Sequence, residues 1–78
     1  MSEHAEIDGT KLVPSMEVRY VPSHGQIENG IIKSLSDENH VFVVYNCDGN
    51  WFQYRDYTAA RTRISDLKLG WSDDARNA

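Results

Sequence analysis

The fold is decided by the stretch His40-Val41-Phe42-Val43-Val44-Tyr45, which contains the longest unbroken apolar run of the chain. β-Branched and aromatic residues favour a strand because their side chains pack well on a pleated surface. A polar turn precedes the stretch at residues 36–39, and residues 46–50, which include an Asp-Gly pair, follow it. We therefore predict a strand over residues 40–45.

The two faces of this strand have different expected environments. Phe42 and Val44 must point outward if residues 41, 43 and 45 point into the core. Two neighbouring apolar side chains on an outer face need a cover. We expect residues 54–57 to supply it. The alternatives are the Leu12-Val13 segment or another protein chain, as in a homodimer through this strand.

Further strands are predicted on both sides of this stretch. Residues 16–21 alternate apolar and polar, which predicts a half-buried strand with Met16, Val18 and Tyr20 on its inner face. Residues 28–35 form the next strand, where Gly30 indicates a bulge or a sharp bend. On the C-terminal side, residues 51–57 suit a strand or an ordered loop, and residues 58–64 suit a strand. Ser65-Asp66-Leu67 resembles one turn of a tight helix, before a short last strand through Leu69 and Trp71.

This series of elements predicts an all-β protein, a small antiparallel barrel of four to five strands. Barrel closure would also remove the exposed edges of so small a sheet. An α+β fold with a helix over residues 54–63 is the alternative. Within the 78 residues we predict a flexible acidic lead-in at 1–11, the barrel domain at 12–71 and a disordered tail at 72–78.

The formal charge of −4 is concentrated at the two ends of the chain. Residues 1–10 hold three acids and no Lys or Arg, and residues 72–78 hold two acids and one arginine. Residues 11–71 hold seven acids and seven bases, so the body is neutral. A neutral body lacks the broad basic field that drives non-specific binding to nucleic acid, although a small basic stripe stays compatible with it.

Several function classes are disfavoured by the residues that the chain lacks. A single cysteine, Cys47, allows no internal disulfide and no cysteine-based zinc knuckle. His4, His24 and His40 lie in three separate segments without metal-ligand spacing, and no phosphate-binding loop is present. No apolar run is long enough to cross a membrane, and no signal-peptide pattern opens the chain. We expect a cytoplasmic protein that is not an enzyme and uses neither metal nor cofactor.

The strand pattern resembles SH3-like barrels of the KOW and Tudor kind. The resemblance rests on four segments that together span about residues 14–71: Met16-Glu-Val-Arg-Tyr, Gly30-Ile-Ile-Lys-Ser-Leu, His40-Val-Phe-Val-Val-Tyr and Ile64-Ser-Asp-Leu. The layout is similar in particular to small phage- and prophage-encoded proteins of bacteria. This resemblance implies a binding module that uses loops at one end of a barrel and works inside a bacterial host cell. It transfers no binding residue, because residues 46–57 are longer and more aromatic than the hairpin expected there.

The candidate binding residues lie mainly between residues 51 and 63, where aromatic and arginine side chains alternate. These two residue types dominate protein–protein hot spots and also stack on bases and hold phosphates. Some of the aromatics must also fill the core of so small a domain, so we expect at least two of the four to be buried. The candidate partner-binding set comprises Trp51, Phe52, Tyr54, Arg55, Tyr57, Arg61 and Arg63, with Phe42 and Val44 from the third strand.

Two functions are compatible with these residues. The first is a non-enzymatic protein-binding module, such as a phage accessory factor that acts on a host or phage protein. The alternative is a nucleic-acid-binding barrel, which requires Arg55, Arg61 and Arg63 to converge on one face. The sequence leaves the choice between a monomer and a homodimer open.

Overall fold

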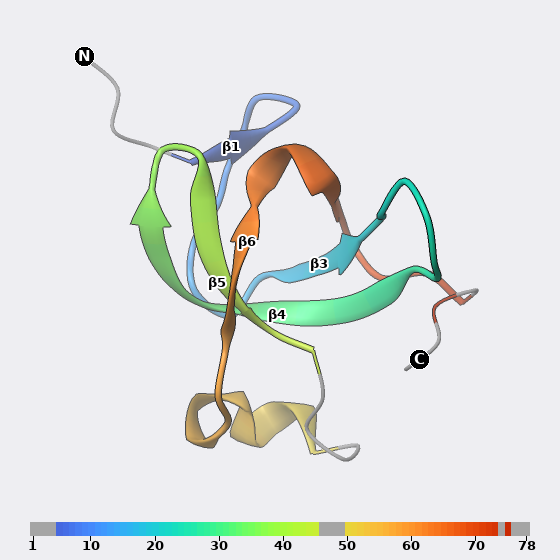
Figure 1. Cartoon of the computed structure of the whole chain (residues 1–78). Helices are drawn as coiled ribbons and strands as arrows, with labels where there is room; N and C mark the ends of the chain where they lie inside the picture. The colour runs from blue at the N-terminus through green and yellow to red at the C-terminus, as the bar shows by residue number, and fades with distance from the viewer. Residues whose placement is uncertain (1–4, 46–49, 74, 76–78) are drawn as a thin grey trace.

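A computed structural model of the chain describes residues 5–45, 50–73 and 75 (Figure 1). Its elements are seven β-strands and two 3₁₀ helices. They are β1 (Glu6–Ile7), β2 (Thr10–Lys11), β3 (Glu17–Tyr20), β4 (Glu28–Asp37), β5 (His40–Val44), η1 (Trp51–Asp56), β6 (Ala60–Arg63), η2 (Ile64–Asp66) and β7 (Leu67–Leu69). The prediction of an all-β fold is confirmed. The α+β alternative is wrong, because the helical segment ends at Asp56 and residues 60–63 form a strand.

Five of the strands form one curled antiparallel sheet in the order β6-β5-β4-β3-β7 (Figure 1). β3, β4 and β5 follow one another as antiparallel hairpins, and η1 lies between β5 and β6. η2 connects β6 to β7, which pairs with β3 at the other end of the sheet. The sheet is barrel-like, but the described residues do not close it, because β6 and β7 do not pair with each other. One long edge of β6 therefore lies at the end of the sheet.

The main core fills the inside of this curved sheet. Val18, Val41 and Val43 are fully buried there, and Met16 and Tyr20 pack partly buried against them. The predicted inner faces of the strands at residues 16–21 and 40–45 are thereby confirmed. The remaining buried members of this core are Ala5, Ile7, Leu12, Ile32, Ile64 and Leu67.

The N-terminal segment differs from the flexible lead-in predicted for residues 1–11. Residues 6–11 form the β1–β2 hairpin, and Ile7 is buried in the main core. Asp8 and Gly9 make its turn with φ of 51° and 81°, the left-handed pair that a type I′ hairpin requires. The Leu12 N–H donates to the Ala5 carbonyl at 2.8 Å and ties the hairpin base together. Residues 1–4 lie outside the described residues.

Gly30 serves a close contact between strands. It pairs in regular register with Val18, and the register shifts in β4 fall later, between Ile32 and Ser34 and between Leu35 and Asp37. The irregularities of β4 therefore lie after Gly30, and the prediction of a bulge at Gly30 itself is wrong. A Cβ atom at Gly30 would lie 2.5 Å from Cγ1 of Val43, so only glycine fits between β4 and β5 at this point.

A second, smaller core lies between η1 and the outer face of the sheet. It joins buried Ile31 and Val44 to buried Tyr54, with Trp51 and Tyr57 packed beside them. The prediction that residues 54–57 cover the strand at residues 40–45 is confirmed for Val44. The physical reason is that η1 folds Tyr54 back onto β4 and β5, where its ring removes apolar surface from water.

The C-terminal segment completes the second core instead of extending the sheet. β7 ends at Leu69, so the predicted last strand does not reach Trp71. The Trp71 indole N–H donates to the Gly30 carbonyl at 2.9 Å, and its ring centroid lies 4.9 Å from that of Trp51. Ala75 is buried, although it belongs to the tail predicted as disordered at 72–78. No helix among the described residues combines the length and apolar character needed to cross a membrane.

Candidate functional site

The structure separates the predicted partner-binding residues into accessible and inaccessible ones. Val44 is fully buried and Tyr54 is 6 % exposed, so neither can contact a partner directly. Val44 was predicted as a candidate because alternation along β5 places it outside the main core, and Tyr54 because it lies in the aromatic–arginine segment; the second core buries both. Trp51 and Tyr57 are partly buried in that same core.

The accessible candidates lie on two different elements. Phe52 and Arg55 are exposed on η1, where Phe52 is 81 % exposed and the Arg55 guanidinium lies 5.3 Å from the ring centroid of Tyr54. Arg61 and Arg63 are exposed on β6. The three arginines do not line one site, because Arg61 and Arg63 border a hollow that Arg55 does not reach.

Phe42 occupies a separate position on the outer face of β5. It is half-buried and pairs across the sheet with Ser34 on one side and Arg61 on the other. With Lys33 and Ala59 it lines a hollow of about 340 Å³. The Lys33 ammonium group donates to the Tyr57 carbonyl at 2.7 Å, so the charge in this hollow already has a partner.

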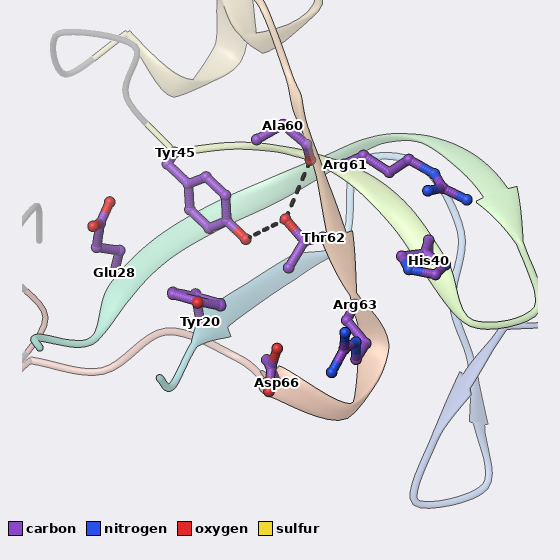
Figure 2. A pocket seen from close by; sticks show the side chains of 9 residues that line it. All are labelled: Tyr20, Glu28, His40, Tyr45, Ala60, Arg61, Thr62, Arg63 and Asp66. Atoms are coloured by element: carbon purple, nitrogen blue, oxygen red, sulfur yellow. Dashed lines mark hydrogen bonds between the residues drawn. The ribbon is translucent and has the colours of Figure 1, made fainter. Parts of the chain in front are cut away.

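A concave surface lies along β6 (Figure 2). It encloses about 530 Å³, and we name it the β6 groove. Residues 60–63 form one wall, and Tyr20, Tyr45, Glu28 and Asp66 are the principal residues of the rest. Among the predicted candidates only Arg61 and Arg63 lie in it. Sequence reasoning missed the other lining residues because they come from four segments that only the curled sheet brings together.

Two tyrosines give the groove an aromatic wall. The rings of Tyr20 and Tyr45 meet edge to face, with centroids 6.0 Å apart and planes at 64°. The Tyr45 hydroxyl lies 2.8 Å from Oγ1 of Thr62, which itself donates to the Ala60 carbonyl at 3.2 Å (Figure 2). Either hydroxyl of this Tyr45–Thr62 pair can act as the donor. Burial raises the pKa of Tyr45 to about 12, so the hydroxyl keeps its proton at neutral pH.

The groove carries charges of both signs. Arg61 and Arg63 lie on the β6 wall, and Glu28 and Asp66 lie on the remaining walls. The Arg61 side chain extends to the side of β6 away from Tyr45 (Figure 2). There its guanidinium contacts Oδ2 of Asp37 at 2.7 Å and Oγ of Ser36 at 3.1 Å. Arg61 is therefore held in place, whereas no described residue forms an ion pair with Arg63.

Asp37 organises the charges at the end of the β4–β5 hairpin. Its Oδ1 accepts the Asn39 backbone N–H at 2.8 Å and lies 3.0 Å from Nδ1 of His40. The hydrogen bond from Asn39, then the contact with His40 and the Arg61 bond, lower the Asp37 pKa to about 2 from its usual 3.8. The ionised carboxylate is thus the form that holds Arg61 against the hairpin.

This pKa predicts how stability depends on pH. A carboxyl whose pKa is lower in the folded chain stabilises it above the unfolded pKa, and that contribution is lost as pH falls through the folded pKa. We expect the stability that the ionised Asp37 adds over Asp37→Asn to be constant above about pH 5, to shrink as pH falls from about 5 to about 1, and to be lost below that. Urea unfolding at a series of pH values measures it. Glu38→Gln, at the neighbouring exposed acid, is the control, and an Asp37→Asn difference that does not vary with pH would contradict the assignment.

The described residues offer no arrangement for metal chemistry. Within residues 5–45, 50–73 and 75, no three histidine, cysteine, aspartate or glutamate side chains gather into a metal site. Cys47 and the Asp-Gly pair at residues 48–49 lie outside the described part of the chain. Comparisons with protein-family models, with curated proteins and with solved structures return no match to this chain.

Proposed function

We propose that this chain is a non-enzymatic protein-binding module whose ligand site is the β6 groove. The observation that carries the proposal is the groove itself, a hollow of about 530 Å³ lined by two tyrosines and two arginines. Tyrosine and arginine are enriched among the residues that dominate binding energy at protein interfaces, because both combine a flat apolar body with hydrogen-bonding groups.

The charge distribution of the groove favours a protein ligand over a nucleic acid. A phosphate backbone needs a continuous row of basic groups. Here Glu28 and Asp66 line the same hollow as Arg61 and Arg63, so the charges of the groove are mixed. A protein segment can carry charges of both signs and so match both walls. The nucleic-acid function is therefore the weaker candidate.

The proposal includes a cellular setting that comes from the resemblance to SH3-like barrels. Small phage- and prophage-encoded proteins share this strand layout, and the curled five-stranded sheet is compatible with it. We infer that the chain acts in the cytoplasm of a bacterial host as an accessory factor that docks on a host or phage protein. Its ligand would then be a segment of that partner.

Selection from a displayed peptide library tests the proposed site. Peptides enriched on wild type are expected to lose about tenfold in affinity for Arg63→Glu, the effect of removing one hot-spot side chain. Lys68→Glu on β7 makes the same charge change at an exposed residue outside the groove, and it is expected to leave the affinity unchanged.

Two results would contradict the proposal. One is a library that yields no peptide enriched on wild type, and the other is an equal loss in both variants. A single-stranded oligonucleotide in the same assay tests the alternative function. Oligonucleotide binding that falls steeply with salt and is lost in Arg63→Glu would favour nucleic acid.

A further inference from the structure

We infer that the β6 groove receives its ligand as an added β-strand, which pairs with the free edge of β6 through the main chains of Arg61 and Arg63. This inference rests on the proposed function and specifies both the binding mode and the chemistry of the partner segment. Three observations support it: the pattern of hydrogen bonds between β6 and β5, the shape of the groove around the free edge of β6, and the charged residues that line the groove.

The alternation of hydrogen-bonded and non-bonded residue pairs between β5 and β6 determines which backbone groups face the groove. β6 pairs with β5 in a regular antiparallel register that places Arg63 opposite His40 and Arg61 opposite Phe42. The next pair in that register is joined by the Ile64 N–H donating to the Asn39 carbonyl at 2.8 Å. Hydrogen-bonded and non-bonded pairs alternate in an antiparallel ladder, so Arg61 and Arg63 occupy non-bonded pairs. Their N–H and C=O groups therefore point away from β5.

No described strand occupies the edge toward which these groups point. β6 is the terminal strand of the five-stranded sheet, and the only strand that it contacts in register is β5. An exposed row of N–H and C=O groups is a template for another strand. Arg61 supplies one donor and one acceptor to such a strand, and Arg63 supplies one donor, because Arg63 is the N-cap of η2 and its carbonyl accepts the first hydrogen bond of that helix.

The groove surrounds this edge and does not lie on one face of the sheet. Thr62 and Tyr45 line it from the inner side, where Thr62 is buried. Arg61 and His40 line it from the outer side, where Arg61 extends away from Tyr45 (Figure 2). A hollow that touches side chains from both faces of a strand must pass its free edge. A strand placed there would lie in the sheet plane with its side chains on both sides.

Charge then specifies the occupant. Side chains of the added strand alternate between the outer face, beside Arg61 and Arg63, and the inner side, beside Tyr20, Glu28 and Asp66. Carboxylates at two alternate positions would match the arginines, since opposite charges on neighbouring strands stabilise the pairing. The residue between them fits as a lysine or arginine, whose apolar stem can pack on a tyrosine while its charge meets a carboxylate. The partner segment is thus an extended acidic–basic–acidic stretch.

A second copy of this chain fits the edge poorly. In every antiparallel register that pairs the outward main-chain groups of β6 with those of β6 in a second copy, an arginine of one copy lies opposite an arginine of the other. Like charges directly opposite each other on neighbouring strands are destabilising. The edge therefore favours a different protein over a homodimer.

A designed peptide tests this inference on the whole chain. The probe is a blocked Thr-Val-Glu-Lys-Glu-Val-Thr peptide, and the control is Thr-Val-Glu-Glu-Lys-Val-Thr, which has the same composition with its glutamates on opposite faces. Nuclear magnetic resonance follows a titration of each peptide to millimolar concentration. We expect the probe to shift the Arg61 and Arg63 amides and to slow their hydrogen exchange about tenfold, as a new backbone hydrogen bond does. The control is expected to bind several-fold more weakly.

A backbone variant separates the edge from the side chain. Arg61→Pro removes an N–H that the β5 ladder does not use, so it is expected to abolish binding of the probe. Arg61→Ala keeps that N–H and is expected to retain binding with a few-fold loss. Should Arg61→Pro fail to fold, the exchange measurement on wild type still decides the question.

The possible outcomes distinguish failure of the binding mode from failure of the binding site. If the probe or a library-selected peptide shifts Tyr20 and Tyr45 but leaves the Arg61 and Arg63 amides unprotected, strand addition is wrong and the groove remains the binding site. If no peptide from the probe pair or the library perturbs the groove, the proposed function fails as well. Equal binding of the probe and the shuffled control would overturn the acidic–basic–acidic assignment.

Discussion

Replacing Gly30 with alanine is expected to lower the free energy of unfolding by about 3 kcal/mol. The added Cβ would lie 2.5 Å from Cγ1 of Val43 and 3.0 Å from the Val44 carbonyl oxygen. Neither neighbour can move away easily, because Val43 is fully buried in the main core and the Val44 carbonyl belongs to β5. The whole domain is expected to be stable by only about 4–12 kcal/mol, so the loss would be a large fraction of the total.

Chemical denaturation of Gly30→Ala beside a second glycine variant measures this effect. Gly9→Asn is the control, because nothing lies within 4 Å of a Cβ at Gly9 and asparagine tolerates its φ of +81°. We expect the control to cost less than about 1 kcal/mol. If Gly30→Ala were as stable as the control, the close approach of β4 and β5 would be contradicted.

Replacing Asn29 with alanine is the second substitution expected to have a large effect, about 2–4 kcal/mol of destabilisation. The Asn29 side chain is 1 % exposed and forms two hydrogen bonds with the main chain of one residue. Its Nδ2 donates to the Ser72 carbonyl at 3.0 Å, and its Oδ1 accepts the Ser72 N–H at 2.8 Å. Alanine would remove both bonds and cannot replace them, because its side chain has no donor or acceptor. The segment after β7 would then lose these two attachments to β4.

The consequence of this loss can be observed at the tryptophans. Trp71 precedes Ser72 and packs against Trp51, and these are the two tryptophans of the chain. Asn29→Ala is expected to change the tryptophan fluorescence of the folded protein and to lower its denaturation midpoint. Asn50→Ala, at an exposed asparagine beside Trp51, is the control. An unchanged midpoint in Asn29→Ala would show that the C-terminal segment contributes little to stability.

The strands of the sheet were predictable because local patterns and burial agree there. The run at residues 40–45 became β5, and alternation placed Val18 and Val41 in the core. The β1–β2 hairpin was missed, although Asp8-Gly9 between Ile7 and Thr10 is a hairpin signal. The polar composition of residues 1–11 led to the prediction of a flexible lead-in, whereas in the structure burial of Ile7 anchors the hairpin in the main core.

The candidate site was only partly predictable, because it depends on how the sheet curls. Arg61 and Arg63 were recognisable as residue types that bind partners. Tyr20 and Glu28 lie at the ends of two paired strands, and no spacing in the sequence relates them to residues 60–63. Val44 and Tyr54 show the opposite error. Alternation marked Val44 as outward and the aromatic–arginine segment marked Tyr54 as a candidate, but neither pattern could show that η1 packs Tyr54 against Val44.

The most direct test of the β6 groove as a ligand site is amide hydrogen exchange of Arg61, Thr62 and Arg63 in the free protein. The hydrogen-bond pattern between β5 and β6 predicts slow exchange for Thr62, because its N–H faces β5. Exchange at Arg61 and Arg63 is expected to be at least about tenfold faster, because their N–H groups face the groove. That pattern would show an edge open to a ligand. Equally slow exchange at all three residues would show that the edge is already covered, and it would contradict the assignment of the β6 groove as a ligand site.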